Sequence, residues 1–290
     1  MAMNLKPAPW SVPLTEDGFA RHVRACNNIR LPADRTPLWI GAGQVGWLAP
    51  AIAAALRDHP KFRPGPTGLL LTDPAALPDI ARTLSQQGLY RWRDEAFDVR
   101  ATIDGPVLAR IDRGALPAFG IQAQGVHVNG IVTRPDGPHI WIGRRAKDKA
   151  LDPGKLDHIV AGGVPAGLDA MQTLVKEADE EASIPADLAG RAMPVGVIRY
   201  TMLRNEGLRR DVLTCYDLEL PADFVPVAAD GEVEAFELWP IARAAETVRD
   251  TDDFKFNVNL VLIDLFIRRG LIGGAEATTL AAALAGTAPV

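Results

Sequence analysis

Alternating hydrophobic and polar positions dominate the second half of the chain, and this period of two predicts β-strands. The first two runs are separated by Arg-Pro-Asp-Gly-Pro, a turn sequence, so they predict a hairpin. A second strand pair is predicted around residues 205–209, and an apolar helix is predicted at residues 257–269, ended by Gly270. The predicted strands cover residues 125–133, 139–144, 195–204, 210–220 and 232–239.

The first part of the chain shows shorter patterns that Pro and Gly separate, and it predicts a compact α+β unit. Because mixed strands and separate helices follow it, the second part predicts a sheet sandwiched between helices. We therefore expect an N-terminal α+β domain at residues 1–116 and a larger domain at residues 117–290. In the first domain, helices are predicted at 17–26, 48–57 and 75–87, and strands at 38–40, 68–72 and 97–103.

One further helix is predicted from a complete set of local signals. Asp169 is a good N-cap, Gln172 stands at the third position of a capping box, and the pattern continues to about Ala182. A spacing of 100° per residue forms one apolar stripe on this helix. The same spacing places Asp179 closer to that stripe than to the other acids. The stripe consists of Met171, Leu174, Val175, Ala178 and Ala182.

The remaining acids of this helix, Glu177, Glu180 and Glu181, are expected to converge on one side. Like charges one turn apart repel each other by roughly 0.2–0.5 kcal/mol per pair. Acids near a helix C-terminus also oppose the helix dipole, by about 0.3–1 kcal/mol each. A divalent cation would remove this conflict, because hard cations bind carboxylate oxygens.

A glycine-containing loop precedes the acidic helix, with Gly162, Gly163 and Gly167. Glycine permits close backbone approach, so backbone groups of this loop are candidates for binding a metal or a phosphate chain. The segment 162–184 resembles the signature of Nudix hydrolases. Gly162, Lys176-Glu177, Glu180-Glu181 and Ile184 follow that signature, whereas Leu168, Ala178 and Ser183 depart from it.

This resemblance implies an α/β/α sandwich with a mixed sheet and a metal-dependent hydrolysis of diphosphates. It implies that Glu177, Glu180 and Glu181 hold Mg²⁺ or Mn²⁺, with the backbone carbonyl near Ala161 as a further ligand. A downstream acid often completes the site in this family. Glu232 and Glu234 are the candidates, on one strand face because they are two residues apart, and either is a candidate general base.

A narrower resemblance extends over most of the chain, to a Nudix subfamily with an extra N-terminal domain that in fungi is fused to thiamin pyrophosphokinase. It implies hydrolysis of thiamin diphosphate, or of its damaged forms, to the monophosphate. A nucleoside diphosphate derivative as substrate and a non-catalytic binding module are the alternatives. The resemblance rests on residues 92–95, 119–120, 125–130, 156–157, 161–163, 176–177, 180–185, 216–221 and 230–234.

Several other polar and aromatic residues are candidates for substrate binding, each with a structural alternative. His127 and Asn129 lie in a predicted strand, as buried polar residues or as substrate contacts. Trp92 would pack at the domain junction or stack on a thiamin-like ring. Three arginines, suited to phosphate or simply solvated, flank the second strand pair. They are Arg199, Arg204 and Arg209.

Composition narrows the class of protein. The 290 residues are 48% hydrophobic and 23% charged, which is typical of a globular protein, and the net charge of −5 argues against a nucleic-acid partner. Residues 1–10 show no apolar core of signal-peptide length, so no signal peptide is expected. Glycines and Pro50 interrupt the one long uncharged run, so no membrane partner is expected either. Cys26 and Cys215 are expected as free thiols in a reducing compartment, the cytoplasm. Mediating a homodimer is one of the roles open to the N-terminal unit.

Overall fold

The structure, a computed structural model, describes residues 18–149, 151–229 and 231–287, and a mixed seven-stranded sheet forms its centre. Five strands follow the order β11-β12-β7-β8-β13, while β10 pairs with β7 and β9 pairs with β8. Strands β12 and β7 are parallel, and the other neighbours are antiparallel. The strands are β7 (Gln122–Arg134), β8 (Gly137–Arg145), β9 (Leu156–Asp157), β10 (Val160–Gly163), β11 (Met193–Arg204), β12 (Gly207–Glu219) and β13 (Val233–Pro240).

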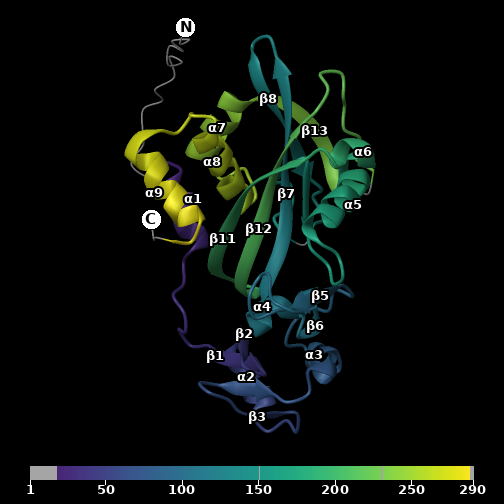
Figure 1. The fold of residues 1–290 in the computed structure, drawn as a ribbon, viewed down its shortest axis with the longest axis vertical. Coiled ribbons are helices and arrows are strands. Elements are labelled where there is room, and N and C mark those ends of the chain that lie inside the picture. The colour runs from purple at the N-terminus through teal and green to yellow at the C-terminus, as the bar shows by residue number, and fades with distance from the viewer. Residues whose placement is uncertain (1–17, 150, 230, 288–290) are drawn as a thin grey trace.

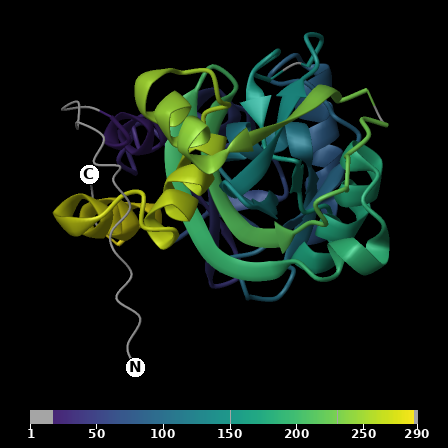
Figure 2. The ribbon, with the colours of Figure 1, turned by 90° about the horizontal axis from the view of Figure 1, so that it is seen from above.

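Helices cover both faces of this sheet (Figures 1 and 2). The alternation along β7 explains why: Val126 and Val128 pack with α5, whereas Ile131 packs with α8 on the opposite face. The α/β/α sandwich expected from the sequence is therefore confirmed. One face carries α5 (Ala170–Ala182) and α6 (Ala186–Ala189), and the other carries α1 (Ala20–Cys26), α7 (Ile241–Asp250), α8 (Val258–Arg268) and α9 (Gly274–Leu284).

Helix α1 packs with the C-terminal helices rather than with the N-terminal unit that follows it in the chain. Val23 and Cys26 are buried in the same core as Phe266 of α8 and Leu280 of α9. The helix was expected from residue 17, which lies outside the described residues, and it begins at Ala20. The first helix thus belongs to the core of the seven-stranded sheet, while the expected boundary at residues 116–117 remains a prediction.

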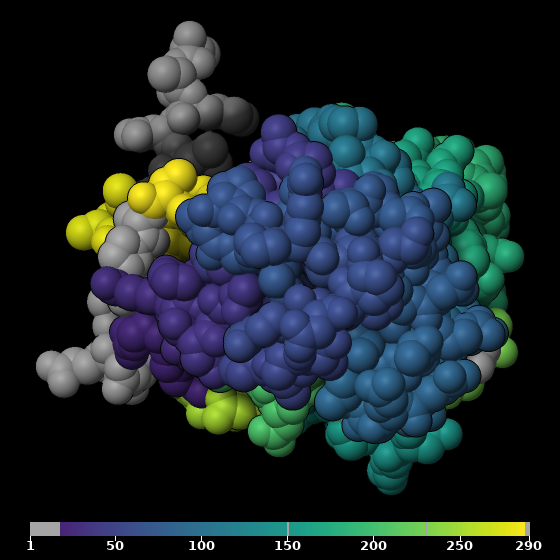
Figure 3. All heavy atoms as spheres, turned by 90° about the horizontal axis from the view of Figure 1, so that it is seen from below, coloured from purple at the N-terminus to yellow at the C-terminus, as the bar shows by residue number. Residues whose placement is uncertain are grey.

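The N-terminal unit contains a four-stranded sheet of order β2-β1-β4-β3 and a separate β5–β6 hairpin. It lies below the lower end of the large sheet and forms most of the surface in Figure 3. Its strands are β1 (Thr36–Ile40), β2 (Gly43–Leu48), β3 (Phe62–Pro64), β4 (Leu69–Leu71), β5 (Ala96–Val99) and β6 (Ala109–Asp112). Its helices are α2 (Pro50–Leu56), η1 (Pro74–Ala76), α3 (Leu77–Gln86), η2 (Arg113–Ala115) and α4 (Leu116–Phe119).

Several elements in both parts of the chain were not predicted: β2, β3, β6, β9, β10, α6, α7 and α9. Strand β2 contains Gly43 and Gly46, which lower strand propensity. A Cβ on Gly46 would lie 2.5 Å from the carbonyl oxygen of Phe119, so close backbone packing requires glycine there. The strand expected at residues 97–103 ends at Val99, because the chain turns there into the hairpin with β6. In the described residues, no helix has the length and apolarity needed to cross a membrane.

Candidate active site

Helix α5 starts with the capping box that the sequence predicts. Asp169 Oδ1 accepts the Gln172 backbone N–H at 2.8 Å, and Gln172 Oε1 accepts the Asp169 N–H at 3.0 Å. The helix ends at Ala182, and Ser183 follows in the left-handed conformation with φ of 52°. Ser183 stands where the family signature has glycine, so the backbone keeps the glycine-like geometry despite the departure.

The three carboxylates of α5 that were expected to converge lie in three different environments. Glu181 is buried, and its Oε2 accepts the Ala161 backbone N–H at 2.9 Å. Glu177 lies against Gly162, where a Cβ would come within 2.7 Å of the Glu177 Cδ. Glu180 is exposed and forms an ion pair with Lys176. Gly162 therefore leaves the space that brings Glu177 against the loop.

Asp179 differs from Glu181 in its exposure to solvent. It is exposed, whereas Glu181 is buried beside Leu174, Ala178 and Ala182. Seven residues from Leu174 to Glu181 amount to almost two full turns of the helix. Glu181 therefore lies beside Leu174, at the edge of the apolar stripe. The buried carboxylate of the helix is thus Glu181, and Asp179 points to solvent.

Burial controls the ionisation of this cluster. Burial raises the pKa of Glu181 well above its usual value, against the opposing hydrogen bond from Ala161. Burial also raises the pKa of Glu177, which Lys176 partly offsets. The Nζ of Lys176 lies 3.3 Å from Glu177 Oε1, and the hydrogen bond to Glu180 raises the lysine pKa. Lys176 pairs with Glu177 and Glu180, and the charge of Lys255 acts on Glu181, so three acids share two cations and negative charge is in excess here.

These residues fit a divalent cation. A carboxylate has about four lone-pair positions, and for Glu181 the structure gives one donor, the Ala161 N–H. Carboxylate oxygens of Glu177, Glu180 and Glu181 are the hard donors that Mg²⁺ prefers. The excess negative charge and the incompletely satisfied buried carboxylate both favour a cation at this position.

One of the two downstream acids lines a small pocket beside Glu181. Glu232 lines this pocket together with Glu181 and Ala161. Strand β13 begins only at Val233, and its register to β8 shifts between Val233 and Ala235. A bulge therefore interrupts the regular strand pattern at these acids, and the expectation that Glu232 and Glu234 share one strand face stays a prediction.

His127 and Asn129 lie on the face of the sheet that α8 covers, away from α5. His127 Nδ1 is 3.0 Å from His158 Nδ1, and its Nε2 is 3.3 Å from Asn257 Nδ2. Asn129 Nδ2 donates to Asp217 Oδ1 at 2.8 Å. Both side chains have structural partners, and their roles in substrate binding stay predictions.

A buried charge network adjoins this histidine pair and was missed from the sequence. Asp157 Oδ2 accepts hydrogen bonds from Arg145 at 2.7 Å and from Lys255 at 3.2 Å. Burial opposes ionisation of Asp157, but the two cations hold its pKa well below the usual range. Burial also lowers the pKa of His158 to about 4. Spacing could not reveal the network, because Lys255 is far from Asp157 in the sequence.

Two of the three candidate arginines of the second strand pair have acidic or aromatic neighbours of their own. Arg204 Nη2 lies 3.0 Å from Asp152, and its guanidinium covers the Phe256 ring at 4.4 Å. Arg209 pairs with Asp211 at 2.9 Å. Arg199 is exposed on the edge strand β11. The structure does not bring them to α5, and their proposed phosphate contacts stay untested.

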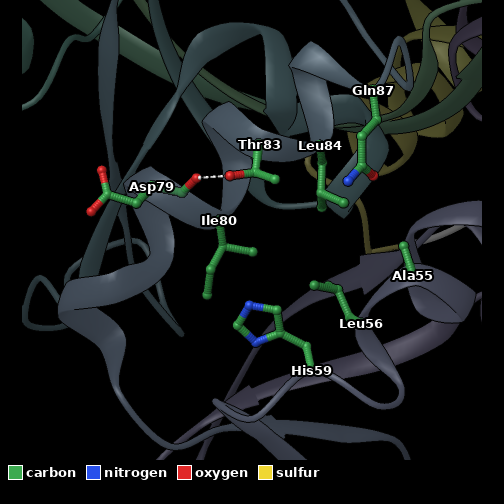
Figure 4. A pocket seen from close by; sticks show the side chains of 8 residues that line it. All are labelled: Ala55, Leu56, His59, Asp79, Ile80, Thr83, Leu84 and Gln87. Carbon is green, nitrogen blue, oxygen red and sulfur yellow. Dashed lines mark hydrogen bonds between the residues drawn. The ribbon is translucent and has the colours of Figure 1, made fainter.

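Trp92 packs against the core of the N-terminal unit, with the Arg82 guanidinium 4.9 Å from its ring. The neighbouring Glu95 instead reaches the acidic site, where its charge contributes to the raised pKa of Glu177. Glu95 pairs with Arg113 at 2.8 Å. A separate pocket of about 260 Å³ lies between α2 and α3, where apolar side chains meet His59 and Asp79 (Figure 4). That pocket lacks a cluster of acids and is not our candidate site.

Comparison with known proteins covers both parts of the chain. Residues 18–123 match a domain of unknown function, DUF4743, and residues 123–258 match the NUDIX domain. The chain is 44% identical over 198 residues to Nudix hydrolase 20, chloroplastic, of Arabidopsis thaliana, covering 68% of this chain and 53% of that protein. Nudix hydrolase 24, chloroplastic, of the same plant is 45% identical over 198 residues, covering 68% and 54%.

The chain thus spans about half the length of these curated relatives. A solved structure from Deinococcus radiodurans is similar with a TM-score of 0.43 and 19% identity, covering 58% of this chain and 97% of that one. The domain matches agree with the sandwich around a mixed sheet and with the glutamates that follow Gly162. The chain belongs to the Nudix hydrolase family and carries a DUF4743 region before its Nudix domain.

Proposed function

We propose that this protein is a metal-dependent hydrolase that cleaves a diphosphate linkage at the carboxylates of α5. The observation that carries the proposal is the buried Glu181, held by the Ala161 N–H beside two further acids. An anionic cluster with a buried member is costly without a cation. Nudix proteins generally use divalent metals, and we propose Mg²⁺ or Mn²⁺ here.

In this proposal each residue of the site has a separate task. Glu177, Glu180 and Glu181 would hold the ion, with the Ala161 carbonyl as a further ligand. The loop glycines Gly162, Gly163 and Gly167 allow the backbone to approach the carboxylates and the phosphates. When bound, the metal supplies charge neutralisation for the phosphates and a lower pKa for bound water. Lys176 restrains Glu177 and Glu180 through its two ion pairs.

The proton of the attacking water needs an acceptor, and the structure favours Glu232 over Glu234. Glu232 lines the pocket that contains Glu181. Glu232 also pairs with Lys149, whereas Glu234 Oε1 accepts the Lys147 backbone N–H at 3.3 Å. In the proposed reaction, water adds to one phosphorus, the bridging P–O bond breaks, and the monophosphate leaves with inorganic phosphate as the second product.

For the substrate we propose thiamin diphosphate or one of its damaged forms. The resemblance of segments throughout the chain to the thiamin-related Nudix subfamily supports this choice, and Trp92 and the N-terminal unit are part of it. We also propose that the protein is located in a reducing compartment, the cytoplasm. Cys26 and Cys215 are buried free thiols, and burial raises the pKa of Cys26 to about 12.

Phosphate release from a panel of diphosphates at equal concentration tests the proposal. With Mg²⁺, wild type should prefer thiamin diphosphate or its oxidised forms, and Glu177→Gln should lower kcat by about 100-fold or more, beyond the 10–100-fold typical of outer-shell changes. A preference for a nucleoside diphosphate derivative would refute thiamin diphosphate as the substrate but leave the proposed diphosphate hydrolysis in place. Activity of Glu177→Gln within a few-fold of wild type would refute the catalytic assignment.

A further inference from the structure

The β5–β6 hairpin of the N-terminal unit touches the loop that leads into α5 (Figure 1). The Ala166 N–H donates to the Ala96 carbonyl at 2.8 Å. The Phe97 ring lies over Gly163 so closely that a Cβ there would be 2.7 Å from the ring. Two segments more than sixty positions apart in the sequence therefore form one wall beside the carboxylates.

This wall presents positive charge at both ends of the loop. The guanidinium carbon of Arg113 lies 3.9 Å from the position of a Cβ on Gly163, and Arg110 Nη2 lies 3.9 Å from that of Gly167. Both side chains are accessible, with 52% of Arg113 and 60% of Arg110 exposed. Arg113 is oriented by Glu95 at 2.8 Å and by the Phe97 ring at 5.8 Å from its centroid.

The backbone that carries Arg113 is held in place from inside the hairpin. The buried Asp112 accepts N–H groups of Gly114 at 2.8 Å, Arg93 at 3.0 Å and Glu95 at 3.1 Å. The Arg113 N–H donates to the Glu95 carbonyl at 2.7 Å. The backbone of Arg113 and Glu95 is thus restrained before any ligand binds, which lowers the entropic cost of a ligand contact.

A diphosphate bound at α5 needs cationic partners besides the metal. On α5 itself Lys176 is already paired with Glu177 and Glu180. An arginine fork matches two phosphate oxygens at once, and its charge acts on the whole group. Glu177 lies against Gly162 and Arg113 lies near the next residue, Gly163, so Arg113 stands at the border between the hairpin and the carboxylates.

We propose that Arg113 binds a phosphate group of the diphosphate substrate, with Arg110 assisting at the far end of the loop, so that the N-terminal unit supplies the anion-binding side of the active site. On binding, the Arg113 guanidinium exchanges the Glu95 carboxylate for phosphate oxygens. The inference rests on the proposed diphosphate chemistry, and it assigns a function to the region that matches DUF4743.

The test measures binding rather than turnover, with methylenediphosphonate as a non-hydrolysable probe in the presence of Mg²⁺, by isothermal titration calorimetry on the full chain. Arg113→Ala should weaken binding about 10- to 100-fold, Arg113→Lys should restore part of it, and Arg110→Ala should lose less. Arg63→Ala is the matched control, because Arg63 is exposed on β3 in the same unit, and it should bind like wild type.

Removing Arg113 also leaves Glu95 unpaired, and a second pair of variants distinguishes these two effects on binding. Glu95→Gln should bind the probe at least as tightly as wild type, and Glu95→Gln with Arg113→Ala should bind as weakly as Arg113→Ala alone. The Mg²⁺-induced rise in Tm should be unchanged in Arg113→Ala, which shows an intact metal site. Arg113→Ala binding within twofold of wild type, or wild type without measurable binding, would overturn the inference. Loss of the Tm shift in wild type would instead refute the proposed metal site.

Discussion

Two clusters of ionisable side chains lie close together in this protein, and they differ in charge balance. In the α5 cluster, Lys176 pairs with Glu177 and Glu180, while Lys255 acts on Glu181 only through its charge. Two of these three carboxylates have raised pKa values. The neighbouring cluster, His127, Asp157 and His158, places its potential ligand atoms within 4.8 Å of one another. By spacing alone, this second group is the better candidate for a metal.

Charge and hydrogen bonding reverse that ranking. Asp157 already pairs with Arg145 and Lys255, so a cation there would face two buried positive charges. The two histidine rings contact each other through their Nδ1 atoms. The comparison teaches that proximity of ligand atoms does not make a metal site. An uncompensated negative charge, as on α5, is the more informative property.

The largest effect on stability is expected in the balanced cluster. Asp157→Asn removes the only carboxylate that pairs with both Arg145 and Lys255 among the described contacts, and leaves two buried cations. We expect a loss of about 3–5 kcal/mol in the free energy of unfolding, measured by chemical denaturation. A loss below about 1 kcal/mol would mean that the cluster is not the structural network described here.

The pH dependence of stability should differ in sign between the clusters. His158 has a pKa lowered from 6.5 to about 4, so the unfolded chain takes up a proton first and stability falls as pH drops from about 6.5 to 4. Since each tenfold change in proton affinity is worth about 1.4 kcal/mol, the loss is roughly 3 kcal/mol. His158→Gln should flatten this part of the Tm–pH profile. An unchanged slope would contradict the assignment.

Glu181 should behave in the opposite way. Its pKa is raised by burial, so its contribution is favourable below the unfolded pKa of 4.5 and is lost as pH rises through the folded value. In EDTA at pH 8, Glu181→Gln should therefore raise the free energy of unfolding. Saturating Mg²⁺ should stabilise wild type by about 2.7 kcal/mol at 100 times Kd, and the variant much less. A destabilised metal-free variant would argue against an unfavourable buried charge.

The smallest effect is expected at Asp179. This acid is exposed on the same helix, so Asp179→Asn should change stability by less than about 0.5 kcal/mol and leave the Mg²⁺-induced Tm shift intact. It controls for the general effect of removing negative charge from α5. A loss of the shift comparable with that of Glu181→Gln would show that all four acids share the ion.

Local signals in the sequence explain what could be predicted. The capping box of α5, the hairpin of β7 and β8 and the apolar α8 depend on residues close together in the chain, and the structure confirms them. The charge of an arginine does not specify its partner, so the pairing of Arg204 with Asp152 could not be foreseen. Nor could Glu95 and Arg113 be placed at the site, because the hairpin–loop contact that brings them there is purely tertiary.

The central claim, that the unbalanced cluster on α5 holds the metal, is tested most directly by locating the ion. Crystals of the full chain grown with Mn²⁺ should be measured at a wavelength that gives manganese anomalous scattering. We predict an anomalous peak within ligand distance of Glu177, Glu180 and Glu181, and none among His127, Asp157 and His158. A peak at the histidine cluster, or no peak at the α5 carboxylates, would contradict the account.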